Sequence, residues 1–255
     1  MSNGQIGAAV ILGLVVAIAA VIGRAVARRK AGWQEATEKL GLQPLDSLDP
    51  ALSDAILALH KPPNTGENLK TEWSLIRIFR CPEPGVDCYS VTIRCDETRE
   101  VWRTGTAIQS RTTEKRVVAL QAPGRIDAPR MNLIPKAVLD PGAGRLAAAI
   151  ARAGNTIVDS VTENDPERVM FSDDSEFEGR YLVRAPEVDS TRAFLNPARR
   201  RALITLDGVQ MSLSGSLLLV ASSAHAITHR SQSLAEQLDA ELGQARRVLA
   251  IFSST

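Results

Sequence analysis

Three stretches of the sequence carry residue types that could hold a metal ion or a phosphate. His225 and His229 are four residues apart, which on a helix would place two imidazoles on one face, as a metal-binding pair requires. No glutamate follows His225, and the pair precedes the last expected helix, so a polar loop is expected. Residues 142–147, GAGRLA, resemble a phosphate-binding loop, but that motif requires a strand directly before it. We expect the start of a helix there.

The third stretch is acidic. SDDSEFE places Asp173, Asp174, Glu176 and Glu178 close together, but it lacks the alternating ligands and the fixed glycine of a calcium loop. A solvated loop is expected, and a docking surface for a basic partner is the alternative. The three arginines at 199–201 are expected on the solvated face of a helix.

The sequence contains none of the common catalytic signatures. It has no serine-hydrolase elbow, no Walker loop and no zinc-protease motif, and three histidines leave little material for acid/base chemistry. The prediction is a protein that is not an enzyme, with no catalytic, cofactor-binding or metal-binding residues. A net charge of +1 generates no strong field for attracting nucleic acid, so no nucleic-acid partner is expected.

The three cysteines are spaced seven residues apart. Cys81, Cys88 and Cys95 fit no common zinc pattern, and reduced cysteines in strands or the core are expected in a reducing compartment. Cys81 and Cys88 flank the turn-like PEPGVD and could face each other across a hairpin. The spacing leaves open whether these two ever pair.

An apolar run near the start of the chain predicts a membrane anchor. Residues 6–23 are eighteen residues without a charge, proline or asparagine, and a bilayer core about 30 Å thick needs ~20 apolar helical residues. A cleaved signal peptide is the alternative, because Ala25 and Ala27 have the spacing of a cleavage site. No positive residue precedes the run, however, and Arg24 interrupts the approach to that site. We therefore expect residues 1–30 to be a retained transmembrane anchor.

The charges around this run predict its orientation. Arg24, Arg28, Arg29 and Lys30 follow the run, whereas residues 1–5 hold no lysine or arginine. Positive residues remain in the cytoplasm. The expected topology is a single pass through a bacterial inner membrane, with the N-terminus outside and the folded body in the cytoplasm.

A stripe of small residues lies within the run. Ala9, Gly13 and Ala17 repeat every four residues, and small residues let membrane helices approach closely. The stripe predicts packing against a membrane-protein partner. The alternative is that alanine and glycine are simply common in membrane spans.

The remaining chain predicts an α+β fold in two parts. In residues 31–135, helices are expected at 33–41 and 50–60, followed by a four-stranded antiparallel meander over 72–122 and a proline-rich connector at 123–135. In residues 136–255, a helix at 142–154 and strands at 156–161 and 180–185 precede a helical stretch at 189–203. A strand pair at 209–213 and 216–222 follows.

A long amphipathic helix is expected to close the chain and to lie on the sheet. Ser233 and Glu236 form a capping box at its start. Its apolar stripe consists of Leu234, Leu238, Leu242, Ala245, Leu249 and Phe252.

The order of these features resembles an uncharacterised family of bacterial membrane-anchored proteins. The likeness rests on Trp33 followed by LGL, on the meander, and on an F-x-x-R-Y-x-V element formed here by Phe177, Arg180, Tyr181 and Val183. The resemblance implies one N-terminal span and a soluble α+β domain, and it implies no activity.

The predicted function is a non-enzymatic, membrane-anchored interaction domain, an accessory or scaffold subunit of a larger inner-membrane complex. Its expected partners are the lipid bilayer and a membrane protein that contacts both the anchor and the soluble domain. The alternative is a membrane-tethered carrier of a small apolar or lipid ligand. A deep apolar cavity between the sheet and the last helix would favour the carrier, and a filled core with an exposed apolar patch would favour the scaffold.

Overall fold

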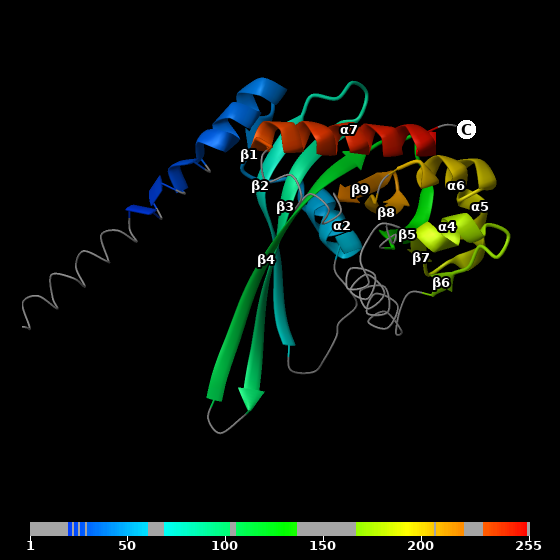
Figure 1. Ribbon diagram of the computed structural model, residues 1–255, viewed down its shortest axis with the longest axis horizontal. Coiled ribbons are helices and arrows are strands. Elements are labelled where there is room, and N and C mark those ends of the chain that lie inside the picture. The colour runs from blue at the N-terminus through cyan, green and yellow to red at the C-terminus, as the bar shows by residue number, and fades with distance from the viewer. Residues whose placement is uncertain are drawn as a thin grey trace, which may run out of the picture.

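The fold is α+β, built on one antiparallel sheet of nine strands with helices on both faces (Figure 1). The computed structural model describes residues 20–21, 23–24, 26–28, 30–60, 69–102, 106–136, 167–206, 208–221 and 232–253. The strand order is β1-β2-β3-β4-β9-β8-β5-β7-β6. The strands are β1 (Gln43–Leu45), β2 (Leu69–Cys81), β3 (Asp87–Trp102), β4 (Thr106–Gln121), β5 (Ala128–Pro135), β6 (Arg168–Val169), β7 (Tyr181–Arg184), β8 (Gln210–Gly215) and β9 (Leu217–Ala221).

Residues 72–122 form three long strands, so the expected four-stranded meander is wrong. The stretch 100–108, predicted as a strand of its own, contains the end of β3 and the beginning of β4. Alternation of side chains continues through both strands, and it does not mark where a long hairpin reverses. The short strand β1 adds to the outer edge of β2, at a position where the sequence suggested only a helix end.

The proline-rich connector is also a strand. Residues 128–135 form β5, which pairs with β8 on one side and with β7 on the other. Pro129 lies where the β5–β8 register shifts, between Ala128 and Met131, and Pro135 is the last residue of the strand. Both are positions at which a strand tolerates a residue without a backbone N–H.

Both expected parts of the chain enter this one sheet. Strand β4, from residues 31–135, pairs with β9, and β5 pairs with β8 and β7 from residues 136–255. The strand pair β8–β9 is confirmed, with a turn that places Gly215 at a φ of +56°, a conformation that favours glycine.

Two helices cover opposite faces of the sheet (Figure 1). Helix α7 (Leu234–Ser253) packs on β4 and β9, and α2 (Pro50–His60) packs on the other face. The predicted capping box is confirmed, because the Ser233 N–H donates to the Glu236 carboxylate at 2.8 Å and the Glu236 N–H donates to the Ser233 hydroxyl at 3.2 Å. The predicted stripe is buried from Leu238 to Phe252, with Leu234 half-buried at its start.

Three shorter helices border the β5–β7–β6 end of the sheet: α4 (Ser175–Arg180), α5 (Val188–Phe194) and α6 (Pro197–Ile204). The expected restart of the helix at Asn196 is confirmed. The Asn196 side chain accepts a hydrogen bond from the Arg199 N–H at 3.0 Å, and Pro197 occupies the first turn.

The helix that leads into the domain is part of its core. Residues 30–40 are helical, Ala36 is fully buried, and the ring of Trp33 stacks on Phe79 of β2 with centroids 4.9 Å apart. Among the described residues, none of the helices has both the length and the apolarity that crossing a membrane requires. Most of the predicted span lies outside the described residues, and so do Ala9, Gly13 and Ala17.

The strands β2, β3 and β4 extend well beyond the two hydrophobic cores as a ribbon, which we call the arm (Figure 1). The arm comprises residues 69–72, 96–102 and 106–112, paired without a register shift. At about 3.4 Å per residue, its two longer strands reach roughly 20–25 Å from the body.

Candidate functional site

The family-like element forms an aromatic cluster at the end of the sheet. The Asp174 side chain caps α4 by accepting a hydrogen bond from the Phe177 N–H at 3.1 Å. The buried ring of Phe177 meets Phe171 edge-on at 5.2 Å and stacks on Tyr181 at 5.5 Å. Val183 is buried in β7, where it pairs with strands on both sides.

The side chains of Arg180 and Tyr181 form hydrogen bonds with carbonyl groups at the C-terminal end of α6. The Tyr181 hydroxyl lies 3.3 Å from the carbonyl oxygens of Leu203 and Leu206, and the Arg180 guanidinium donates to the Ile204 carbonyl at 3.2 Å. These groups satisfy backbone acceptors at the helix terminus. Phe177, Arg180, Tyr181 and Val183 therefore join α4, β7 and α6, and their described contacts are structural.

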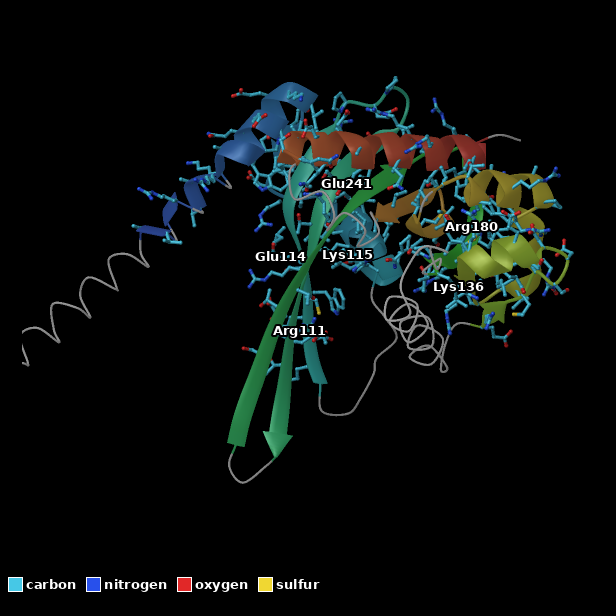
Figure 2. The ribbon with its side chains drawn as sticks, viewed as in Figure 1. Arg111, Glu114, Lys115, Lys136, Arg180 and Glu241 are labelled. Carbon is cyan, nitrogen blue, oxygen red and sulfur yellow. The ribbon has the colours of Figure 1, made fainter. Side chains whose placement is uncertain are left out.

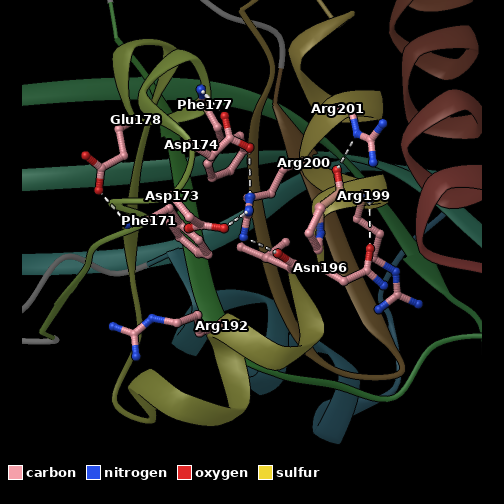
Figure 3. A network of polar contacts seen from close by, with 12 residues as sticks. Phe171, Asp173, Asp174, Phe177, Glu178, Arg192, Asn196, Arg199, Arg200 and Arg201 are labelled. Carbon is pink, nitrogen blue, oxygen red and sulfur yellow. Dashed lines mark hydrogen bonds and ion pairs between the residues drawn. The ribbon is translucent and has the colours of Figure 1, made fainter.

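The acidic stretch is only partly the solvated loop that was expected. Asp173 and Glu176 are exposed, but Asp173 and Asp174 pair with a buried arginine (Figure 3), and residues 175–180 are helical. The Arg200 side chain is 4% exposed, and its Nε and Nη2 donate to Asp174 at 2.9 Å and to Asp173 at 2.5 Å. Although desolvation opposes it, the hydrogen bond from the Phe177 N–H and the ion pair with Arg200 lower the pKa of Asp174. Glu178 accepts a hydrogen bond from the Phe171 N–H.

The arginines at 199–201 are likewise not simply solvated. Arg199 donates to the carbonyls of Phe194 and Phe252, which links α6 to the end of α7, and burial lowers its pKa. Arg200 lies under the acidic stretch, and Arg201 remains exposed (Figure 3). The run of three arginines in the sequence did not indicate that the side chain of Arg200 is buried.

A pocket of about 390 Å³ lies where the entering helix, the sheet and the start of α7 meet. We call it the arginine pocket. It is lined by Arg28, Gly32, Trp33, Arg77, Thr92, Glu114, Arg116 and Leu234. The lining therefore combines three guanidinium groups and one carboxylate with an indole ring and a leucine.

The strand pattern explains why polar side chains gather here. On the face of β4 that α7 covers, Leu120 and Val118 are buried, and the next residues on this face are Arg116 and Glu114. The apolar face thus becomes polar towards the start of α7. Thr92 of β3 lies directly across from Arg116. Side chains two residues apart on one strand and opposite on the next share a face.

A backbone irregularity brings the third arginine into the pocket. Arg77 has a φ of +51°, which is unusual for a residue with a side chain, and it lies where the β2–β3 register shifts between Ile76 and Phe79. From there its guanidinium donates to Glu114 at 2.8 and 3.4 Å. The bulge therefore sets the position of this side chain on the α7-covered face.

One lining residue of the pocket, Arg116, forms a largely buried ion pair with α7. The Nε and Nη2 atoms of Arg116 donate to the two carboxylate oxygens of Glu241, both at 2.6 Å, so β4 is bound to the middle of α7. Figure 2 labels Glu241 on the helix and Glu114 on the strand beneath. The side chains of Arg116 and Glu241 are 20% and 10% exposed.

The opposite face of the sheet carries a second polar group. Lys115 donates to the Gln210 side chain at 2.5 Å, and burial lowers the pKa of Lys115. His60, at the end of α2, packs edge-on against Trp73 at 5.6 Å. Desolvation, followed by the charge of Lys115, lowers the pKa of His60 to about 4.

Cys81 and Cys88 do face each other across the β2–β3 hairpin, as predicted. They are directly paired, buried and present as free thiols, and Cys95 is also buried and free. The hydrogen bond with Cys81, together with burial, raises the pKa of Cys88. A thiol of raised pKa is a weak nucleophile.

The remaining predicted motifs lie outside the described residues. These are His225, His229 and the glycine-rich residues 142–147. Within the described part of the chain, no group of three or more histidine, cysteine, aspartate or glutamate residues could hold a metal ion.

Comparison with known proteins identifies no relative: neither a family model, a curated protein nor a solved structure matches the chain. The resemblance to membrane-anchored bacterial proteins therefore stays a prediction.

The residues of the arginine pocket were not predicted from the sequence. Arg116 was the available signal, because it directly continues the apolar face of Leu120 and Val118, and a charged residue beside a buried apolar face needs a partner. That partner, Glu241, is 125 residues away.

Proposed function

We propose that this chain is a non-enzymatic interaction protein, anchored in a bacterial inner membrane by residues 6–23, with its folded body in the cytoplasm. The anchor is supported by the length and apolarity of that run, and the orientation by the four positive residues that follow it. Within this proposal the chain is an accessory or scaffold subunit of a larger complex.

The entering helix supports a rigid connection between anchor and body. The described residues between 20 and 40 are helical, and Trp33 and Ala36 are packed into the domain. A helical connection that is packed into the domain at one end keeps the folded body at a fixed distance and orientation from the anchor. The arm would then be held in a set orientation relative to the bilayer.

The observation that carries the interaction role is the open edge of the arm. β9 pairs with β4 over residues 118–121, and none of the described strands pairs with the same edge of β4 between Thr106 and Val117. An open strand edge presents backbone N–H and C=O groups to which an extended segment of another protein can add as a strand. Ser110, Arg111 and Thr112 are exposed there.

The polar clusters of the body support a role without catalysis. Arg200 is paired with Asp173 and Asp174, and Arg116 with Glu241. These ion pairs join α6 to the acidic stretch and β4 to α7, so their charges are already matched within the fold. Beneath α7 the apolar side chains of the helix and of the sheet form a buried core, and the pocket at the start of α7 is lined largely by charged side chains, so the described residues favour an interaction protein over a carrier of an apolar ligand. The exposed large apolar residues in the described part are Val21, Val26 and Met170, so the partner surface we propose is backbone rather than an apolar patch.

Photo-crosslinking in intact cells tests this function. A photoreactive residue replaces Arg111 in the arm or, as a control, the exposed Arg247 on α7. We expect a crosslinked product of discrete mass from position 111, none from position 247, and loss of the product when residues 6–23 are deleted. Products of the same mass from both positions, or a product that persists without residues 6–23, would contradict the proposal.

A further inference from the structure

We propose that the arginine pocket binds a phosphate group, and that at the membrane this group belongs to the headgroup of an acidic phospholipid. The inference rests on the proposed membrane anchoring for the source of the phosphate. The pocket and its charges are independent of that source.

The charge of the pocket favours an anion. Its lining holds Arg28, Arg77 and Arg116 against one carboxylate, Glu114, and Glu241 lies behind Arg116. Counting both carboxylates, the formal charge is three minus two, which leaves an excess of +1. The three guanidiniums come from three different elements, so they can approach a bound group from several sides.

The donors suit a phosphate in particular. A guanidinium carries five N–H groups in a planar fork that matches phosphate oxygens, and it pairs with them through two parallel hydrogen bonds. Glu241 occupies the Nε and Nη2 edge of Arg116, and a guanidinium has a second edge for such a pair. The Thr92 hydroxyl adds a neutral donor to the same lining.

The apolar part of the lining suits a lipid. Trp33 and Leu234 form the wall beside the charges, and the bare backbone of Gly32 faces Leu234. Tryptophan is enriched at the level of lipid headgroups because its ring is both apolar and polar. The volume of about 390 Å³ falls within the range of roughly 300–1,000 Å³ that is usual for small-molecule sites.

The position of Arg28 places the pocket at the headgroup layer. Arg28 follows residue 23, the end of the apolar run, by five residues, which is about 7.5 Å along a helix. Each polar layer of a bilayer is about 5–7.5 Å thick, taking a ~30 Å core from a total of ~40–45 Å. A headgroup could therefore reach the pocket without leaving the membrane surface.

The test compares two arginines of the same helix. Arg24 and Arg28 are both exposed and lie one helical turn apart, but only Arg28 lines the pocket. The full chain is purified in a neutral detergent, and binding of dihexanoyl phosphatidylglycerol, dihexanoyl phosphatidylcholine and inorganic phosphate is measured by titration calorimetry. Arg28→Gln should weaken phosphatidylglycerol binding about tenfold or more, since it removes charge-assisted hydrogen bonds, whereas Arg24→Gln should change it less than about twofold.

Each outcome decides the proposal. Preference for phosphatidylglycerol over phosphatidylcholine, lost in Arg28→Gln alone, supports the lipid source. Binding of inorganic phosphate without phosphatidylglycerol, with the same dependence on Arg28, supports the pocket but assigns it a free phosphate. Equal affinity for the two lipids would overturn the assignment to an acidic phospholipid, because both carry a phosphate. Equal losses in both variants, or no binding by the unmodified chain, would overturn the site.

A separate experiment tests the proposed membrane anchoring. Cell fractionation of the chain with and without residues 6–23 reports on membrane attachment, whichever ligand the pocket takes. Membrane attachment that survives Arg28→Gln alongside lost lipid binding is the expected combination.

Discussion

Replacing Glu241 by glutamine should destabilise the protein, because it leaves Arg116 charged and unmatched beneath α7. Removing one partner of a fully buried ion pair costs about 3–5 kcal/mol. The Arg116 side chain is 20% exposed and borders the arginine pocket, so water solvates part of the remaining charge. We therefore expect a loss of about 2–3 kcal/mol in the free energy of unfolding.

Thermal unfolding of the full chain, followed by circular dichroism, measures this loss. For chains of this size 1 kcal/mol corresponds to roughly 2–4 °C, so Glu241→Gln should lower the Tm by about 4–12 °C. The matched control is Asp239→Asn, which makes the same acid-to-amide change at an exposed position of α7 and should lower the Tm by less than about 2 °C.

A double variant separates the lost charge from the lost packing. In Arg116→Met/Glu241→Leu both charges are replaced by apolar side chains of similar size, which often restores stability. The double variant should recover most of the loss, giving a coupling energy above about 1 kcal/mol in the cycle. The reasoning is refuted if Glu241→Gln leaves the Tm within about 1 °C of the unmodified chain. It is also refuted if the double variant is as unstable as the sum of both single variants.

Two further predictions concern packing and pH. Leu242 is 4% exposed on the face of α7 that covers the sheet, so Leu242→Ala should lower the free energy of unfolding by about 2–5 kcal/mol, measured by thermal unfolding. The control Asp239→Ala, at an exposed position of α7, should lower it by less than about 0.5 kcal/mol. Equal effects would mean that α7 is not part of the core. The pKa of His60 is lowered from 6.5 to about 4, so the unfolded chain binds a proton at that residue first as the pH falls. The contribution of neutral His60 is therefore fully present above pH 6.5 and is lost between about pH 6.5 and 4, by at most about 3.4 kcal/mol at 1.36 kcal/mol per pKa unit. His60→Gln should flatten the dependence of the Tm on pH over that interval, and an unchanged slope would show that His60 does not carry it.

Local features of the fold could be predicted where they depend on neighbouring residues. The capping box at Ser233, the restart of the helix at Asn196 and the buried stripe around Leu242 all follow from contacts within a few positions. Side-chain alternation likewise located β8, and short apolar runs located β7 and β9. Predictions failed at β5, whose prolines are tolerated at a shift in its pairing and at its last residue, and at the long β3–β4 hairpin.

The candidate sites depended on distant residues, and this is why they were missed. Asp173 and Asp174 looked solvated because nothing nearby in the sequence shows that Arg200 turns inward beneath them. Arg116 and Glu241 meet only because β4 and α7 pack together. A charged residue in a strand indicates that a partner must exist, but the sequence does not say which one.

The sequence alone predicted the α+β class, the helix caps and the amphipathic closing helix, and it indicated that Cys81 and Cys88 could face each other, because each depends on spacing along the chain. Only the tertiary structure decided that strands from both halves form one sheet and that β5 belongs to it. It also decided that the bulge at Arg77 directs its guanidinium to Glu114, and that the entering helix, β2–β4 and α7 together enclose an arginine pocket. The physical reason is that burial and charge pairing are set by which surfaces meet, and surfaces brought together from distant parts of a chain leave no periodic signal in its sequence.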